Sequence, residues 1–73
     1  MPSTAIADIA YDAVRRILTI SYVGGGTYDY IGVEPETHRE LLLARAKGVF
    51  VNSVIKRRYA FRRRKRADVN FPD

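Results

Sequence analysis

The sequence predicts a small α+β domain: a three-stranded antiparallel β-meander covered by two helices and followed by a basic C-terminal tail. The first half of the 73-residue chain alternates apolar and polar residues around three consecutive glycines, and the second half changes to helical spacing after Pro35. Eight of the 13 Lys and Arg residues then fall between Lys56 and Arg66. A chain this short forms one domain, which we expect over residues 1–61, with a flexible basic extension over residues 62–73.

Three segments of the first half have the residue alternation of β-strands. They span residues 6–11, 17–23 and 27–33. Residues 12–16 are expected to form the first turn. Gly24, Gly25 and Gly26 are expected to form the second, because glycine adopts the positive φ angles of a tight reversal at little steric cost.

The length of the glycine loop decides which residues of the second hairpin face each other. If all three glycines form the loop, Tyr22 lies opposite Tyr28 and Ile20 lies opposite Tyr30, whereas a two-residue loop would divide the aromatic residues between the two faces. We therefore predict the three-residue loop. The sheet face beneath the helices then carries Leu18, Ile20, Tyr22, Tyr28 and Tyr30. The opposite face carries a more solvent-tolerant set, namely Ile17, Thr19, Ser21, Asp29 and Ile31.

A first helix is expected to begin at Pro35. Proline suits the first helical position, where its missing N–H would be unpaired, and Glu34 and Glu36 complement the helix dipole there. Gly48 is a natural C-terminal stop. The apolar side of this helix is supplied by Leu41, Leu42, Ala44 and Ala46.

A second helix is expected to begin at residues 49–52, with Asn52 as its N-cap. Its apolar stripe consists of Phe50, Val51, Val54, Ile55 and Tyr59. Continuing the helix further would place Arg58 and Arg62 on this apolar side, so we expect it to end near residues 59–61. Beyond that point the charges of the Arg/Lys run repel one another.

The positive charge is concentrated at the C-terminal end of the chain. Residues 56–73 hold eight basic and two acidic side chains, a net charge of +6, whereas residues 1–55 hold five basic and six acidic, a net charge of −1. Such a patch attracts a polyanion, and nucleic acid is the commonest polyanion in a cell. The expected phosphate contacts are Arg57, Arg58, Arg62, Arg63, Arg64, Lys65 and Arg66.

Four aromatic side chains are candidates for stacking on nucleic-acid bases. Tyr59 and Phe61 lie within the basic segment. Tyr28 and Tyr30 would form a stacking platform on an open sheet, or else pack beneath the helices. The face that they share with Ile20 favours packing.

The sequence gives little support for catalysis or for a bound metal or cofactor. It has no Cys, and its single histidine, His38, lies among charged residues, which indicates a surface position. The glycine run lacks the downstream lysine of a phosphate-binding loop, and the carboxylates are scattered. We therefore expect that the protein is not an enzyme and that it binds no cofactor or metal. The short apolar stretches and the absence of a signal peptide predict a cytoplasmic protein with no membrane partner.

An ordered set of residues also matches a known family. It begins with the strand Leu18-Thr19-Ile20-Ser21-Tyr22 and a glycine turn, and continues with Tyr28-Asp29-Tyr30, Gly32-Val33, Gly48, Phe50, Asn52, Ile55, Tyr59 and Phe61. In this order the residues resemble the KTSC domain, a short module named from the C-terminus of some lysyl-tRNA synthetases. The resemblance covers about residues 6–63. It implies no catalytic residue, and the attachment to synthetases suggests RNA binding. The run from Arg62 to Arg66 extends beyond the pattern of the family's core.

Two functional hypotheses follow from the sequence. The first is a non-catalytic nucleic-acid-binding module, with RNA favoured over DNA, in which the C-terminal basic cluster contacts phosphates. The alternative is a small protein-interaction module that docks an acidic surface of a larger partner. A solvated tail that merely keeps the protein soluble is less favoured, because acidic residues serve solubility better than basic ones.

Overall fold

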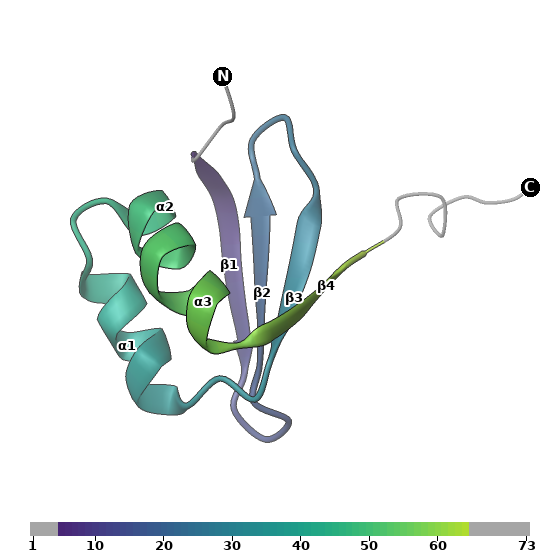
Figure 1. The fold of residues 1–73 in the computed structure, drawn as a ribbon, viewed down its shortest axis with the longest axis vertical. Helices are drawn as coiled ribbons and strands as arrows, with labels where there is room; N and C mark the ends of the chain where they lie inside the picture. The colour runs from purple at the N-terminus through teal and green to yellow at the C-terminus, as the bar shows by residue number, and fades with distance from the viewer. Residues whose placement is uncertain (1–4, 65–73) are drawn as a thin grey trace, which may run out of the picture.

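The computed structural model describes residues 5–64, which form a four-stranded antiparallel sheet with all helices on one of its faces (Figure 1). The strands, in their order across the sheet, are β1 (Ile6–Asp12), β2 (Ile17–Tyr22), β3 (Thr27–Ile31) and β4 (Ala60–Arg63). The α+β class is confirmed, but the predicted three-stranded meander gains a fourth strand. Two residues expected in the flexible extension, Arg62 and Arg63, are sheet residues, while 65–73 lie outside the described residues.

β4 forms because the chain leaves the last helix in an extended conformation. Tyr59 still donates its N–H to the Ile55 carbonyl (3.0 Å) but has φ −122° and ψ 150°. From Ala60 onward successive side chains point to opposite faces of the sheet. The charges of Arg62 and Arg63 are thereby separated. This reduces the charge repulsion on which the prediction of a flexible extension is based.

The β2–β3 hairpin has a three-residue loop, as predicted, but the loop lies one residue earlier, at 23–25. The Gly25 N–H donates to the Tyr22 carbonyl, and the Tyr22 N–H donates to the Gly26 carbonyl, both at 3.1 Å. Gly24 has φ +70° at the third position of this turn, which is the position of a type II turn that requires a positive φ.

Moving the loop shifts the strand register by two residues from the predicted one. Tyr28 lies opposite Ile20, and Tyr30 lies opposite Leu18. Because side chains alternate with a period of two, a shift of two residues leaves each side chain on its predicted face. The predicted division into a core face and an open face is therefore confirmed, although the predicted cross-strand pairs are wrong.

The helices begin and end at other residues than predicted. Helix α1 (Pro35–Leu43) has its proline in the first turn, as expected, but ends before the extended residue Ala44 and does not reach Gly48. A second helical segment then runs without a break through three labelled parts. These are α2 (Lys47–Phe50), the π-helical turn η1 (Val51–Ile55) and α3 (Lys56–Arg58).

Two capping predictions in this region are wrong. Gly48 is buried in the first turn of the second helical segment and does not terminate the first helix. Asn52 is exposed within the π-helical turn and is not an N-cap, since Ala46 holds the N-cap position and provides no side-chain hydrogen bond. The second helical segment begins at Lys47, two residues before the predicted start at residues 49–52, because residues 44–46 alone connect it to α1.

The core lies between the sheet and the helices. Tyr30 is 2% exposed and Ile20 is completely buried, as the predicted core face requires. Of the predicted helical stripe, Val51 and Ile55 are buried. The complete cluster consists of Leu18, Ile20, Tyr30, Val33, Leu41, Val51 and Ile55.

The other face of the sheet has no helix over it in the described part of the chain (Figure 1). It carries the alternate residues of all four strands, among them Thr19, Asp29 and Arg62. We call it the open face. None of the helices within residues 5–64 is both long and apolar enough to cross a membrane.

Candidate nucleic-acid interface

The alternation of β4 divides the predicted arginine cluster between two surfaces. Arg62 pairs with Asp29 and therefore lies on the open face, whereas Arg63 pairs with Tyr28 and lies on the side of the helices. Arg64 continues the alternation toward the open face, and its N–H donates to the Thr27 carbonyl (2.8 Å).

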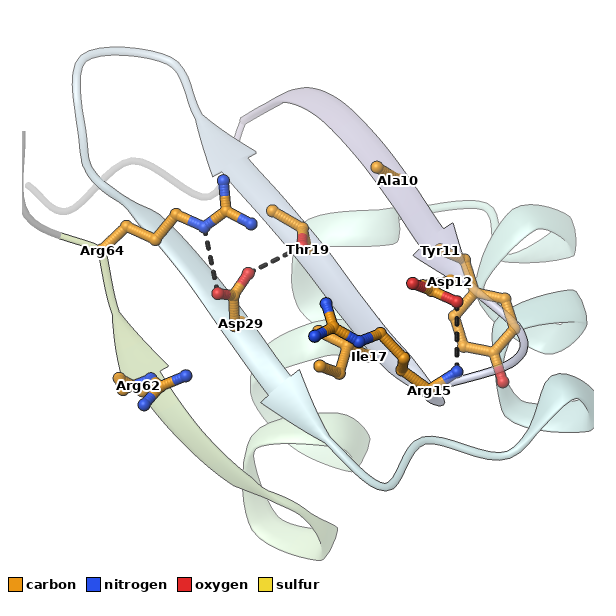
Figure 2. A pocket seen from close by; sticks show the side chains of 9 residues that line it. All are labelled: Ala10, Tyr11, Asp12, Arg15, Ile17, Thr19, Asp29, Arg62 and Arg64. Carbon is orange, nitrogen blue, oxygen red and sulfur yellow. Dashed lines mark hydrogen bonds and ion pairs between the residues drawn. The ribbon is translucent and has the colours of Figure 1, made fainter. Parts of the chain in front are cut away.

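A hollow of about 330 Å³ lies on the open face, and three arginines from separate parts of the chain line it. Arg62 and Arg64 come from β4 and the residue after it, and Arg15 comes from the turn between β1 and β2 (Figure 2). The other lining residues are Ala10, Tyr11, Asp12, Ile17, Thr19 and Asp29. We call this site the arginine hollow.

Asp29 is the buried acidic group of the arginine hollow, and it is 8% exposed. Thr19 Oγ1 donates to its Oδ1 (2.7 Å) and Arg64 Nε donates to its Oδ2 (3.0 Å), so each carboxylate oxygen has a partner (Figure 2). Burial raises the pKa of Asp29, but the hydrogen bonds from Thr19 and Arg64, together with the charges of Arg64 and Arg62, outweigh burial and lower it. Asp29 is therefore a carboxylate that holds Arg64 against the sheet.

Arg15 is positioned by a turn that an acidic side chain organises. Asp12 Oδ1 accepts hydrogen bonds from the N–H groups of Val14 and Arg15, both at 3.1 Å. Arg16 follows with φ +59°, and its carbonyl accepts the Val33 N–H (2.9 Å). The chain reverses there, and the Arg15 side chain lies over the open face beside Ile17 (Figure 2).

The other side of β4 combines basic and aromatic side chains. Lys56 Nζ lies 5.9 Å from the centroid of the Phe61 ring, and the guanidinium carbon of Arg63 lies 5.8 Å from the centroid of the Tyr28 ring. The Arg63 side chain crosses Gly26, where an added Cβ would approach its Nε to 2.5 Å. We call this group the β4 aromatic edge.

Two of the predicted phosphate contacts belong to neither surface. Arg57 and Arg58 are exposed on α3, where they line a separate shallow hollow with Ser53 and Val54. Lys65 and Arg66 lie outside the described residues. Within residues 5–64, the predicted cluster is thus not one continuous patch.

The four candidate stacking residues differ in exposure. Tyr30 is buried, as the packing interpretation predicts, and Tyr28 is half-buried beneath Arg63. Tyr59 is half-buried, and its hydroxyl shares a hydrogen bond with Thr37 (2.9 Å). Phe61 is 42% exposed. Of these four rings, Phe61 therefore has the most open surface for a base.

The structure corrects the prediction for His38. Its ring is half-buried and stacks on Tyr11, with 4.4 Å between the ring centroids and 22° between the ring planes. The Tyr11 hydroxyl donates to the Val33 carbonyl (2.6 Å). His38 therefore fastens α1 to β1. No group of three or more His, Asp or Glu side chains within residues 5–64 is arranged to hold a metal ion.

Sequence reasoning missed two parts of the arginine hollow. In the sequence, Arg15 lies in a turn that carries no signal of a role, and Asp29 is one of several scattered carboxylates. Face parity offered one signal, because it places Thr19 and Asp29 on the same side of neighbouring strands. The other partner of Asp29, Arg64, is 35 residues away and directly follows a strand that the sequence does not predict.

The KTSC domain family model matches residues 2–59, well over half of the chain. The chain belongs to the KTSC domain family. A protein from Tsukamurella paurometabola is 42% identical over 57 residues, which cover 78% of this chain and 85% of the relative.

A solved structure supports the same conclusion for the fold. The crystal structure of a KTSC domain protein from Yersinia pestis matches with a TM-score of 0.79 at 35% sequence identity, over 89% of this chain and 92% of that chain. The family-model match ends at Tyr59, immediately before β4. Arg62 and Arg64 of the arginine hollow therefore lie beyond the residues that the family model matches.

Proposed function

We propose that this KTSC domain is a non-catalytic RNA-binding module whose open face contacts the phosphates of a single strand. The observation that carries the proposal is the arginine hollow, because arginines from the first turn and from the last strand gather at one place on the face without helices. A planar guanidinium fork matches the geometry of a phosphate group.

The charge balance of the arginine hollow favours an anionic ligand. Arg64 shares its charge with Asp29, but within residues 5–64 neither Arg15 nor Arg62 forms an ion pair. Two guanidinium groups therefore remain available to a ligand. The lining holds three arginines and two aspartates, Asp12 and Asp29, so the site keeps a net charge of +1.

The composition of the arginine hollow also predicts weak sequence specificity. Phosphate contacts fix the position of a nucleic acid but do not read its bases. The core tyrosines Tyr28 and Tyr30 lie on the opposite face of the sheet and are unavailable to a base bound in the hollow. Affinity then arises mainly from phosphate neutralisation and falls as salt increases.

The test compares two variants with equal charge loss. Arg15→Gln with Arg62→Gln removes the two unpaired arginines and leaves the Asp29–Arg64 pair intact. Arg39→Gln with Arg45→Gln removes the same charge from exposed positions on α1 and just after it. The dissociation constant for a fluorescent single-stranded RNA is measured by anisotropy at several salt concentrations.

The first variant is expected to flatten the slope of log K against log[salt] by about 1.4, since each lost phosphate contact contributes about 0.7 for single strands. The second variant is expected to change the slope by much less. Equal changes in both variants, or no RNA binding by the natural sequence, would contradict the proposal. Binding of an acidic peptide but not RNA, with the same dependence on Arg15 and Arg62, would favour an acidic protein partner instead.

A further inference from the structure

Phe61 is an exposed ring that the core holds in place. It lies opposite Tyr30 in the sheet, on the side of the helices, yet it is 42% exposed. Its ring centroid is 5.3 Å from that of Tyr30 and 6.0 Å from that of Tyr28. The two tyrosines support the ring from the core side, so its orientation is fixed while part of its surface stays open.

Cations border this ring on the β4 aromatic edge. Lys56 Nζ lies 5.9 Å from the Phe61 centroid, near the outer limit of a cation–π contact, and can turn toward a phosphate at small cost. Arg63 lies over the neighbouring Tyr28 ring. An aromatic ring flanked by positive side chains is the arrangement with which proteins bind single-stranded nucleic acid, because every base has a face that can stack.

Resting on the function proposed above, we propose that Phe61 stacks on an unpaired base of the RNA strand whose phosphates lie in the arginine hollow. Phe61 and Arg62 are consecutive and point to opposite faces of β4, the last strand of the sheet. A strand bound at both positions crosses the outer edge of β4. A base inside a duplex has no free face for this contact, so the ligand class is single-stranded nucleic acid.

The test uses three fluorescent oligonucleotides of equal length: a single-stranded RNA, an abasic ribose-phosphate strand, and an RNA duplex. The full chain is expected to bind the single strand about 5- to 150-fold more tightly than the abasic strand, which is the range for one base–aromatic stack. Equal affinity for the single strand and the abasic strand would overturn the stacking inference and leave phosphate binding intact. Failure to bind any of the three would instead contradict the proposed function.

Two substitutions locate the stack. Phe61→Leu keeps an apolar side chain over Tyr30 but removes the ring, and it is expected to lower the affinity for RNA to that for the abasic strand. Phe61→Tyr is expected to keep the difference between these two ligands. The matched control is Phe50→Leu, at a half-buried ring on the second helical segment, which is expected to keep it as well. A Phe61→Leu variant with unchanged melting temperature and a preserved difference would overturn the inference.

Discussion

Asp29 joins the core strands to the arginines that follow them. It accepts hydrogen bonds from Thr19 on β2 and from Arg64 beyond β4, so one carboxylate connects three parts of the sheet. The Arg64 side chain is 58% exposed, and water screens its ion pair with Asp29. The Thr19 hydrogen bond lies closer to the sheet and is less screened. Asp29 thus stabilises the position of β4, which carries Arg62 of the proposed interface.

Replacing Asp29 with Asn is expected to lower the free energy of unfolding by about 1–2 kcal/mol at neutral pH, through loss of the charge-assisted hydrogen bonds. The folded state lowers the pKa of Asp29 below its ordinary value of 3.8. Its contribution is therefore present above that ordinary value and is lost as the pH falls through the folded pKa. Urea unfolding between pH 2 and pH 7 measures this. Identical pH dependence in the Asp29→Asn variant would contradict the assigned role.

Tyr30 tests whether the central tyrosines serve packing or binding. It is 2% exposed, and burial together with the hydrogen bond to Tyr22 raises its pKa. Tyr30→Ser is expected to cost about 3–5 kcal/mol of unfolding free energy, as other large aromatic truncations in cores do. Tyr30→Phe, which keeps the ring, is expected to cost about 1 kcal/mol. A Tyr30→Ser domain that melts normally but no longer binds RNA would show that packing is the wrong role.

The sequence predicted side-chain faces better than side-chain partners. Period-two alternation places Ile20 and Tyr30 on one face and Thr19 and Asp29 on the other, whichever of the two registers holds, because the registers differ by two residues. The contact between Arg64 and Asp29 depends on where a distant segment returns to the sheet. Local patterns carry no information on that return.

β4 is the element that differs most from the sequence prediction, which has no strand there. Its sequence is Ala60-Phe61-Arg62-Arg63, which lacks the apolar–polar alternation that is typical of a strand. Exposed charges are common on strands at the border of a sheet, where they discourage pairing with other chains. The two arginines, which prevent β4 from being recognised as a strand in the sequence, are thus suited to its position at the border of the sheet.

Hydrogen exchange tests β4 without any substitution. In an antiparallel pair the hydrogen-bonded positions alternate, and the Arg64 N–H donates to the Thr27 carbonyl. The Arg62 and Arg64 amides should therefore exchange more slowly than the amides of Phe61 and Arg63, which point away from β3. NMR-detected exchange resolves all four amides. Uniformly fast exchange of all four amides would contradict β4 and support the flexible extension that the sequence predicts.

At the scale of the whole molecule, the two faces of the sheet differ in their cover and in the side chains that they carry. The helices cover one face and its apolar side chains, and the arginine hollow lies on the other. The fold class and the core face were predictable, because amphipathic patterns decide which surfaces are buried. The arginine hollow was not, because it needs a turn near residue 15 and a strand near residue 62 to meet across the sheet.

The most direct test of the central claim observes the guanidinium groups themselves. In an NMR titration with a short single-stranded RNA, the Nε–H signals of Arg15 and Arg62 are expected to shift first and furthest. Those of Arg39 and Arg45, at α1 and just after it, are expected to stay in place at the same RNA concentration. Shifts of similar size at all four arginines, or shifts confined to Arg39 and Arg45, would contradict binding at the open face.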